Sequence, residues 1–507
     1  MRVRTFALAA AAAVACSAGA ALLVPTPAAH GRSTVLTVAE PAPPPEGPSA
    51  HFVDGKTLLL DARLGHASVA RDPHGGSTGT FVLATVTGAD VAPDARSAPP
   101  PVHLAIAVDR SGSMAGAKMN SAIAAAVGVI ERMHDGDRAT VVSFDQAARV
   151  LVPPTTIDAS SRPTVEASIR AMRAGGDTCI SCALNTATSE LDASPGPRDE
   201  VKRILLISDG EATTGIRDVT GLRALASRAR DRGIAVSTIG VDLEFDEKVM
   251  AAIAQESNGR HFFVPDPSAL EQVFDEELGT LETAVASEAE LSIDPAPGVI
   301  VEDVLDRSFR REGTRVLVPL GAFDARQEKT VLLKVRVPAD ADGEKSVADL
   351  ALAYRDVVRR EDGRCAGTLA VDVRSDGSAQ RDLDPFVAAR VERSRTARAL
   401  TTANELFSKG KADAARDELA RRQSELATTT PQAVAAASAL PRAARAFARP
   451  VDKDLEEQAG VLAQAQSGFA GGPAATSPAG HFAPAPPSPA TKQALKKNQA
   501  NASDLAF

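Results

Sequence analysis

Three oxygen-bearing side chains follow one apolar run at regular spacing. Residues 102–108 are mostly apolar and long enough for a buried strand, and Asp109, Ser111 and Ser113 come directly after them. In an open α/β sheet, ligands bind at the edge where the strands end. Carboxylate and hydroxyl oxygens suit Mg²⁺, which keeps several waters and takes few protein ligands. The spacing therefore indicates a magnesium site, although a solvated turn with a serine N-cap also fits these residues.

Two later stretches add candidate ligands. Residues 175–178 are Gly-Gly-Asp-Thr, which places Thr178 in a glycine-rich loop before a predicted helix. Residues 204–208 are a second apolar run of strand length, and Asp209 follows it directly. The pattern is thus two strand ends that each carry an aspartate, with a hydroxyl-bearing loop between them in sequence.

Residues from about 102 to 281 resemble a von Willebrand factor type A (VWA) domain with a complete metal-ion-dependent adhesion site. The resemblance extends to residues 237–241 and 245–247, which are similar to the fifth strand and the next helix, and to residues 258–263, at the last strand. Asp177 departs from the family's pattern, because many relatives have Gly-Gly-Thr without a residue between. The departure bears on the backbone path of this loop more than on Thr178 as a ligand. The metal residues implied by the resemblance are Asp109, Ser111, Ser113, Thr178 and Asp209.

The resemblance implies a function in binding. In such a site, Ser111, Ser113 and either Thr178 or a water contact Mg²⁺ directly, while Asp109 and Asp209 act partly through bound waters. A Glu or Asp of a protein partner fills the coordination position that faces solvent, and Mn²⁺ or Ca²⁺ are alternatives to Mg²⁺. We therefore expect metal-dependent adhesion or complex assembly. The alternative is a structural envelope scaffold whose metal only stabilises the loops.

The sequence offers little for catalysis. It contains neither the G-x-x-x-x-G-K-[ST] phosphate loop nor the H-E-x-x-H zinc motif. Ser111 has no evident histidine partner, although His103, His134 and His261 lie elsewhere in the chain. We expect that the protein is not an enzyme, and a hydrolase or chelatase-like component is the less favoured hypothesis.

The composition restricts the classes of partner that we expect the protein to bind. The chain has 507 residues and a net charge of -9, whereas binding to nucleic acid needs a basic surface. With one Tyr and no Trp, the chain also lacks a basic, aromatic-rich patch. We expect a protein partner, no nucleic acid, and membrane contact only through the N-terminal segment.

The N-terminal segment is typical of export. Arg2 and Arg4 precede an apolar stretch over residues 6–24, so residues 1–30 are interpreted as a signal peptide. The residues before Cys16 loosely resemble a lipobox, so lipidation of Cys16 is an alternative, and an uncleaved anchor is another. Each places the protein outside the cytoplasm as a secreted, periplasmic or envelope-anchored bacterial protein. Residues 31–50 are predicted to be a Pro-rich linker.

Cys179 and Cys182 form a C-x-x-C pair directly after Thr178. A redox motif would call for a thioredoxin-like setting, and a zinc site for two further ligands close by, and neither is evident. A local disulfide between Cys179 and Cys182 is favoured over two buried thiols. Cys365 is then left over, either buried or open to intermolecular pairing.

The predicted architecture is multidomain α/β plus β. Residues 99–284 alternate strands and helices, which indicates a doubly wound, Rossmann-like domain. Short alternating runs at 51–98 and 285–378 indicate a β-sandwich, so the VWA domain is inserted in it or flanked by it, similar to inter-alpha-trypsin inhibitor heavy chains. Residues 379–468 are predicted to be helical, and residues 469–507 to be a disordered Ala/Pro-rich tail.

Overall fold

The computed structural model describes residues 49–90, 99–243, 245–379, 382–445, 449–469 and 488–506, without the side chains of residues 443 and 444. All of these belong to one unit, residues 41–507. The predicted signal peptide with Cys16, and the linker as far as residue 48, lie outside the described residues. Within the described part of the chain, no helix combines the length and the apolar character needed to cross a membrane.

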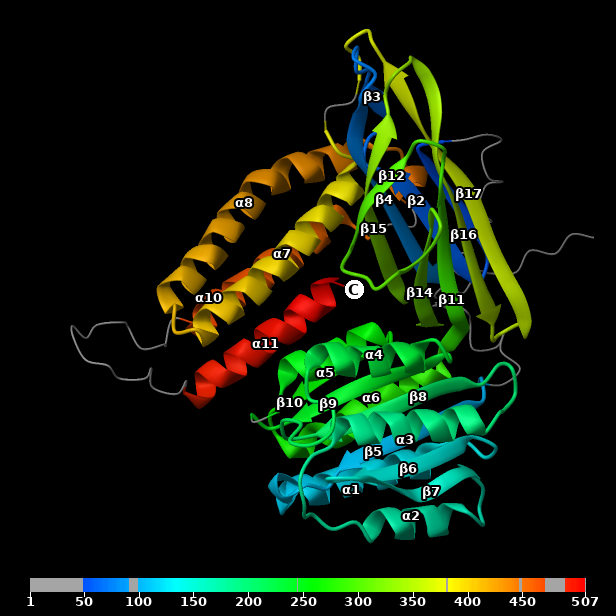
Figure 1. The fold of residues 1–507 in the computed structure, drawn as a ribbon, viewed down its shortest axis with the longest axis vertical. Helices are drawn as coiled ribbons and strands as arrows, with labels where there is room; N and C mark the ends of the chain where they lie inside the picture. The colour runs from blue at the N-terminus through cyan, green and yellow to red at the C-terminus, as the bar shows by residue number, and fades with distance from the viewer. Residues whose placement is uncertain are drawn as a thin grey trace, which may run out of the picture. The chain divides into compact units, whose positions relative to one another are not determined.

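Helices cover both faces of a six-stranded sheet in the middle of the chain (Figure 1). Its strands are β5 (Val102–Asp109), β6 (Arg138–Phe144), β7 (Ala148–Thr156), β8 (Val201–Ser208), β9 (Ile234–Val241) and β10 (His261–Val264). Their order is β10-β9-β8-β5-β6-β7, and only β7 runs antiparallel to its neighbour. The direction of strand order therefore reverses between β5 and β8.

The central strand β5 is buried along its whole length because helices pack on both faces of the sheet. Leu104 and Ile106 belong to the core shared with α1, α2 and α6, while Ala105 and Ala107 belong to the core shared with α3, α4 and α5. The helices are α1 (Ala117–Arg132), α2 (Arg162–Arg170), α3 (Ile180–Ala193), α4 (Val219–Arg230), α5 (Glu247–Glu256) and α6 (Leu270–Glu282), with short 3-10 turns η2 (Gly112–Met114) and η3 (Pro267–Ala269).

Two antiparallel sheets share a second core, which forms the β-sandwich. One sheet has the order β1 (His51–Gly55), β2 (Leu58–Leu64), β4 (Ser77–Gly88), β15 (Glu328–Pro338), β12 (Ile300–Leu305). The other has the order β13 (Arg310–Glu312), β14 (Arg315–Asp324), β11 (Ala284–Pro295), β16 (Gly343–Asp356), β17 (Glu361–Arg374), with β3 (Ser68–Ala70) added in parallel to β17.

The α/β domain interrupts this sandwich. β4 lies before the domain in sequence and β15 lies after it, and the two strands pair from Ser77↔Pro338 to Thr87↔Glu328. Strands from both sides of the domain thus complete each sheet. The predicted fold class is confirmed, with the domain inserted in the sandwich and a helical region after it.

The helical region packs on the sheet that contains β4 and β15 (Figure 1). Asp384 caps its first helix, because the side chain accepts hydrogen bonds from the N–H groups of Phe386 and Val387. Leu83 of β4 and Leu332 of β15 join the core of this region. Its helices are α7 (Pro385–Ser408), α8 (Ala412–Ala439), α9 (Arg442–Arg445), α10 (Val451–Phe469) and α11 (Pro489–Ala506).

The predicted disordered tail over residues 469–507 is wrong for Phe469, which is buried at the end of α10, and for residues 489–506, which form α11. Residues 470–487 and 507 lie outside the described residues. Lys496 of α11 is buried, and its ammonium donates a hydrogen bond to the backbone oxygen of Phe245 (2.8 Å) and lies 3.6 Å from the centre of the Phe245 ring. Contacts with the α/β domain and with α7 therefore order a helix that its composition did not predict.

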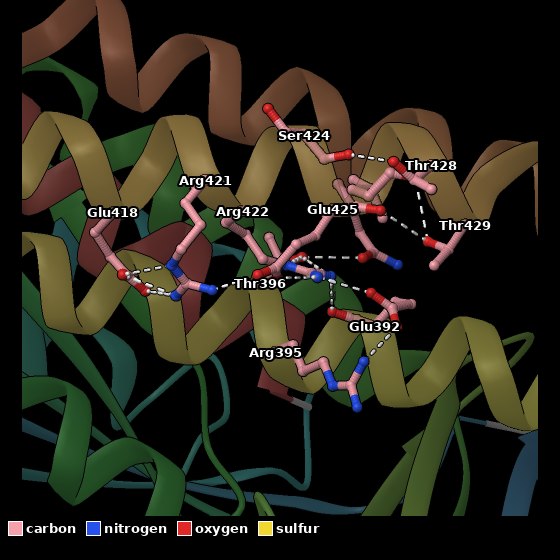
Figure 2. Close-up of polar contacts among 12 residues, drawn as sticks. Glu392, Arg395, Thr396, Glu418, Arg421, Arg422, Ser424, Glu425, Thr428 and Thr429 are labelled. Atoms are coloured by element: carbon pink, nitrogen blue, oxygen red, sulfur yellow. Dashed lines mark hydrogen bonds and ion pairs between the residues drawn. The ribbon is translucent and has the colours of Figure 1, made fainter.

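A buried arginine joins α7 to α8 (Figure 2). The Arg422 guanidinium donates to the backbone oxygen of Glu392 (2.8 Å) and to Oγ1 of Thr396 (3.0 and 3.1 Å), and pairs with the Glu392 carboxylate (2.7 Å). The neighbouring Arg421 pairs with Glu418 and Glu425 at the surface. The two arginines thus differ in burial on the same helix.

We expect Arg422→Ala to destabilise the helical region by about 3–5 kcal/mol, because it leaves buried polar partners without their donor. Arg421→Ala is the matched control, since that side chain is 57% exposed, and its effect is expected to stay below about 1 kcal/mol. Urea denaturation followed by circular dichroism measures both. Equal effects of the two substitutions would contradict the assignment.

Candidate metal centre

The residues predicted to hold a metal gather where the strand order reverses. β5 ends at Asp109, and β8 ends at Ser208, immediately before Asp209. The two strands are parallel neighbours, with Val108 opposite Ile207. Both aspartates therefore lie at the same sheet edge, at the position where open α/β sheets bind ligands.

Hydrogen bonds link the D-x-S-x-S loop to this second strand end. Ser113 Oγ donates to Asp209 Oδ1 (2.7 Å) and lies 3.0 Å from Ser111 Oγ. Asp109 accepts from the N–H of Ser111 (2.8 Å) and from the hydroxyl of Ser208 (2.5 Å). Asp109 and Asp209 are fully buried, whereas Ser113 is exposed. The two carboxylates therefore lie buried at the bottom of the cluster, and the cluster reaches the surface at Ser113.

Thr178 reaches the same place from the loop before α3. A Cβ atom added to Gly210 would lie 3.6 Å from Ser113 Oγ and 3.7 Å from Thr178 Oγ1, so both hydroxyls border Gly210. The Thr178 backbone is held by Thr213, whose N–H donates to the Thr178 oxygen and whose hydroxyl accepts from the Thr178 N–H, both at 2.9 Å. The extra residue Asp177 is exposed. All five predicted residues therefore meet at one edge.

A cation that the sequence did not predict also lies here. Lys118, in the first turn of α1, places Nζ 2.7 Å from Asp209 Oδ2 and 2.9 Å from Asp242 Oδ2. Asp242 follows the end of β9, the neighbour of β8. Lys118 comes five residues after Ser113 on the same motif segment, and this proximity is the one signal that could have identified it.

The electrostatics of the edge reflect two buried acidic groups. Burial raises the pKa of Asp109 to about 6, and the negative charge of Asp209 adds to this rise, while hydrogen bonds from Ser208 and Ser111 oppose it. Burial acts to lower the pKa of Lys118, yet its hydrogen bonds with Asp209 and Asp242 outweigh burial and raise that pKa. The edge therefore favours positive charge.

The donor set fits a hard divalent cation. The described residues contain no group of three or more His, Cys, Asp or Glu side chains that could hold a metal. A metal at this edge would therefore rest on the hydroxyls of Ser111, Ser113 and Thr178, supported by two carboxylates. Such an all-oxygen set suits Mg²⁺, Mn²⁺ or Ca²⁺ and not a soft metal.

Cys179 and Cys182 are joined by a disulfide at the start of α3, immediately after Thr178. The β8–α4 loop packs on this turn, because the N–H of Ile216 donates to Ser181 Oγ (2.9 Å). Cys365 is a free, buried thiol in β17. The disulfide therefore lies between the threonine of the candidate site and a loop at its rim.

Comparison with known proteins identifies the class. Residues 103–276 match the profile of the von Willebrand factor type A domain. Residues 103–276 are thus identified as a VWA domain, and the VWA domain is a protein-interaction module that often binds a divalent cation at its adhesion site.

Curated relatives are distant. The uncharacterized protein sll0103 of Synechocystis sp. is 25% identical over 50% of this chain and 62% of its own length. The uncharacterized protein YfbK of Escherichia coli is 26% identical over 40% of this chain and 35% of its own length. Bovine inter-alpha-trypsin inhibitor heavy chain H4 is 25% identical over 43% of this chain and 24% of its own length. The matches thus span less than two thirds of each relative.

Solved structures support the fold. A von Willebrand factor type A protein from Catenulispora acidiphila superposes with a TM-score of 0.61 at 18% identity, over 82% of this chain and 97% of that chain. The ArnB paralog VWA2 from Sulfolobus acidocaldarius gives a TM-score of 0.52 at 17% identity, over 80% and 98% of the two chains. The likeness therefore covers most of the chain and not the VWA domain alone.

Without metal, ionisation of Asp109 is expected to weaken the fold. Its pKa of about 6 in the folded protein exceeds the ordinary value of 3.8, so the stability from its bound proton is complete below about pH 4 and is lost as the pH rises through 6. Asp109→Asn does not ionise, and in EDTA at about pH 7.5 we expect it to be about 3 kcal/mol more stable than the wild type, at about 1.4 kcal/mol per pKa unit. Urea denaturation measures the difference, which should vanish near pH 4. A variant less stable than the wild type at the higher pH would contradict this.

Proposed function

We propose that this chain is a metal-dependent protein-binding protein of the bacterial cell envelope, acting in adhesion or complex assembly. Ser111, Ser113 and Thr178 would hold Mg²⁺, or Mn²⁺ or Ca²⁺ in its place, with Asp109 and Asp209 beneath them. Bound there, the metal supplies an open coordination position, and a Glu or Asp of the partner protein fills it. The observation that carries the proposal is the cluster of hydroxyls above two fully buried aspartates at the strand-order reversal.

Exposed apolar side chains beside the site support a protein partner. Among the described residues, five large hydrophobic side chains are exposed. Two of them are Ile216, on the β8–α4 connection that begins at Asp209, and Val219, the first residue of α4. Apolar groups close to a metal would bury surface against a protein and add affinity to the single carboxylate contact.

The contacts of Ser111 favour a binding role over catalysis. The described contacts of Ser111 Oγ include Ser113 and no histidine. His103 contacts Thr140, and His134 contacts Asp137, toward the amino ends of β5 and β6. Because neither histidine is placed to activate a site hydroxyl, we propose that the protein is not an enzyme.

The Cys179–Cys182 disulfide supports a location outside the cytoplasm, since disulfides persist mainly in oxidising compartments. With the export-type N-terminal segment, this supports a secreted, periplasmic or envelope-anchored protein. The net charge of -9 supports a protein partner and no nucleic acid.

Titration calorimetry with Mg²⁺ and Mn²⁺ tests the metal site. We expect one-site binding by the wild type, loss of binding in Asp109→Ala and Thr178→Ala, and unchanged binding in Thr164→Ala, whose exposed threonine lies in α2. Loss of the Thr178 hydroxyl removes a ligand, and loss of the Asp109 carboxylate removes the charge beneath the metal. Thermal melts verify that each variant is folded.

A displayed peptide library, selected in Mg²⁺ and counter-selected in EDTA, tests the partner chemistry. We expect the retained peptides to share one Asp or Glu. A folded wild type that binds no divalent metal would sink the mechanism. Metal binding with no metal-dependent peptide would favour the scaffold, in which the metal only stabilises the loops.

A further inference from the structure

Lys118 bridges two carboxylates at the rim of the candidate metal site. Its ammonium lies 2.7 Å from Asp209 Oδ2 and 2.9 Å from Asp242 Oδ2. The three groups come from different elements, namely α1, the end of β8 and the end of β9. The arrangement therefore depends on the packing of α1 and the sheet, because the three residues are not close to one another in the sequence.

The bridge divides the functions of the two Asp209 oxygens. Oδ1 accepts from the Ser113 hydroxyl, on the side of the predicted metal ligands, whereas Oδ2 receives the Lys118 ammonium. The Asp209 side chain is fully buried, and that of Lys118 is 19% exposed. A carboxylate buried to this degree is stable in its ionised form only with a partner of opposite charge.

Asp109 and Asp209 are the two buried acids of the candidate site, whereas Asp145, a third buried acid after β6, is paired with Arg110. Asp109 contacts the neutral groups Ser111 N–H and Ser208 hydroxyl, so Lys118 supplies the positive charge in the described contacts of this pair. A divalent ion beside Ser113 would face that ammonium across the same carboxylate. The divalent ion and the ammonium would both lie beside one carboxylate, and two positive charges that close together repel strongly in a poorly solvated site.

We propose that the Lys118 ammonium neutralises the Asp209 carboxylate in the metal-free protein and thereby lowers the affinity of the site for divalent metal. The inference rests on the proposed function, because it takes the metal to bind beside Asp209. Lys118 competes with the metal for the charge of Asp209 and thereby sets the metal concentration at which the site fills.

Asp242 gives Lys118 an alternative anchor. Its side chain is 39% exposed, so an ammonium held there keeps more water than one held on Asp209. The N–H of Leu243 donates to Asp242 Oδ1 (2.7 Å), which leaves Oδ2 for the lysine. If a metal binds, Lys118 would give up its hydrogen bond to Asp209 and remain on Asp242, with no covalent bond broken and no proton moved.

Calorimetric titration of the full chain with Mg²⁺ and Mn²⁺, together with thermal melts in EDTA and in Mg²⁺, tests the assignment. Lys118→Met keeps the length of the side chain without its charge, and Lys118→Arg retains the charge as the matched control. We expect Lys118→Met to bind each metal about tenfold more tightly or better, to melt lower than the wild type in EDTA, and to gain more from Mg²⁺. Lys118→Arg should stay close to the wild type in all three properties.

Asp242→Asn provides a second test that does not alter the lysine. It removes the alternative anchor, so Lys118 is held on Asp209 alone, and we expect metal binding to weaken severalfold. This variant also decides the matter if Lys118→Met fails to fold in either buffer.

The outcomes separate this inference from the proposed function. If wild type and Lys118→Met bind metal equally, or if the variant binds more weakly, Lys118 is not a competing cation, although the metal site stands. If neither protein binds metal while both are folded, the proposed function fails, and the inference fails with it.

Discussion

The burial of two like-charged carboxylates at one sheet edge is the constraint on which the candidate site depends. Asp109 and Asp209 are both 0% exposed, at the ends of adjacent parallel strands. Ionised carboxylates in such a place are unfavourable unless hydrogen bonds and positive charge compensate them. The surrounding hydroxyls and Lys118 provide that compensation in the described structure. A divalent cation would meet the same electrostatic demand more fully, which links the stability of the domain to the proposed binding of metal.

The VWA domain that contains this edge is inserted in the β-sandwich, and the strands that enter and leave the domain lie close together. Gly88 ends β4, and a Cβ atom there would lie 2.2 Å from the Asp324 oxygen and 3.2 Å from Val285 of β11. The strands that enter and leave the VWA domain thus lie against each other, as an inserted domain requires. The absence of a side chain at Gly88 allows this close approach. Contacts such as Arg355 with Asp199 (2.6 Å) hold the domain against the sandwich.

The sequence was sufficient for those features that depend on local patterns. Asp109 and Asp209 could be predicted to lie together because each follows an apolar strand, and parallel strands end at a common edge. The insertion could also be predicted, since the strands before the domain cannot close a core alone. The pairing of Lys118 with Asp242 could not be predicted, because it depends on how the first turn of α1 meets the residue after β9, and the position of Lys118 five residues after Ser113 was its one signal.

The last helix, α11, is a second feature that the sequence did not predict, because it depends on tertiary contacts. Residues 489–506 are rich in alanine and polar groups, and an exposed basic segment of this kind is normally solvated. Here Lys496 is buried, and its ammonium contacts both the ring and the backbone oxygen of Phe245. Phe245 belongs to the connection between β9 and α5 that also contains Asp242, the partner of Lys118. The connection that contains Asp242 therefore also contacts α11 through Phe245, so the C-terminal helix and the candidate metal site contact the same segment of the chain.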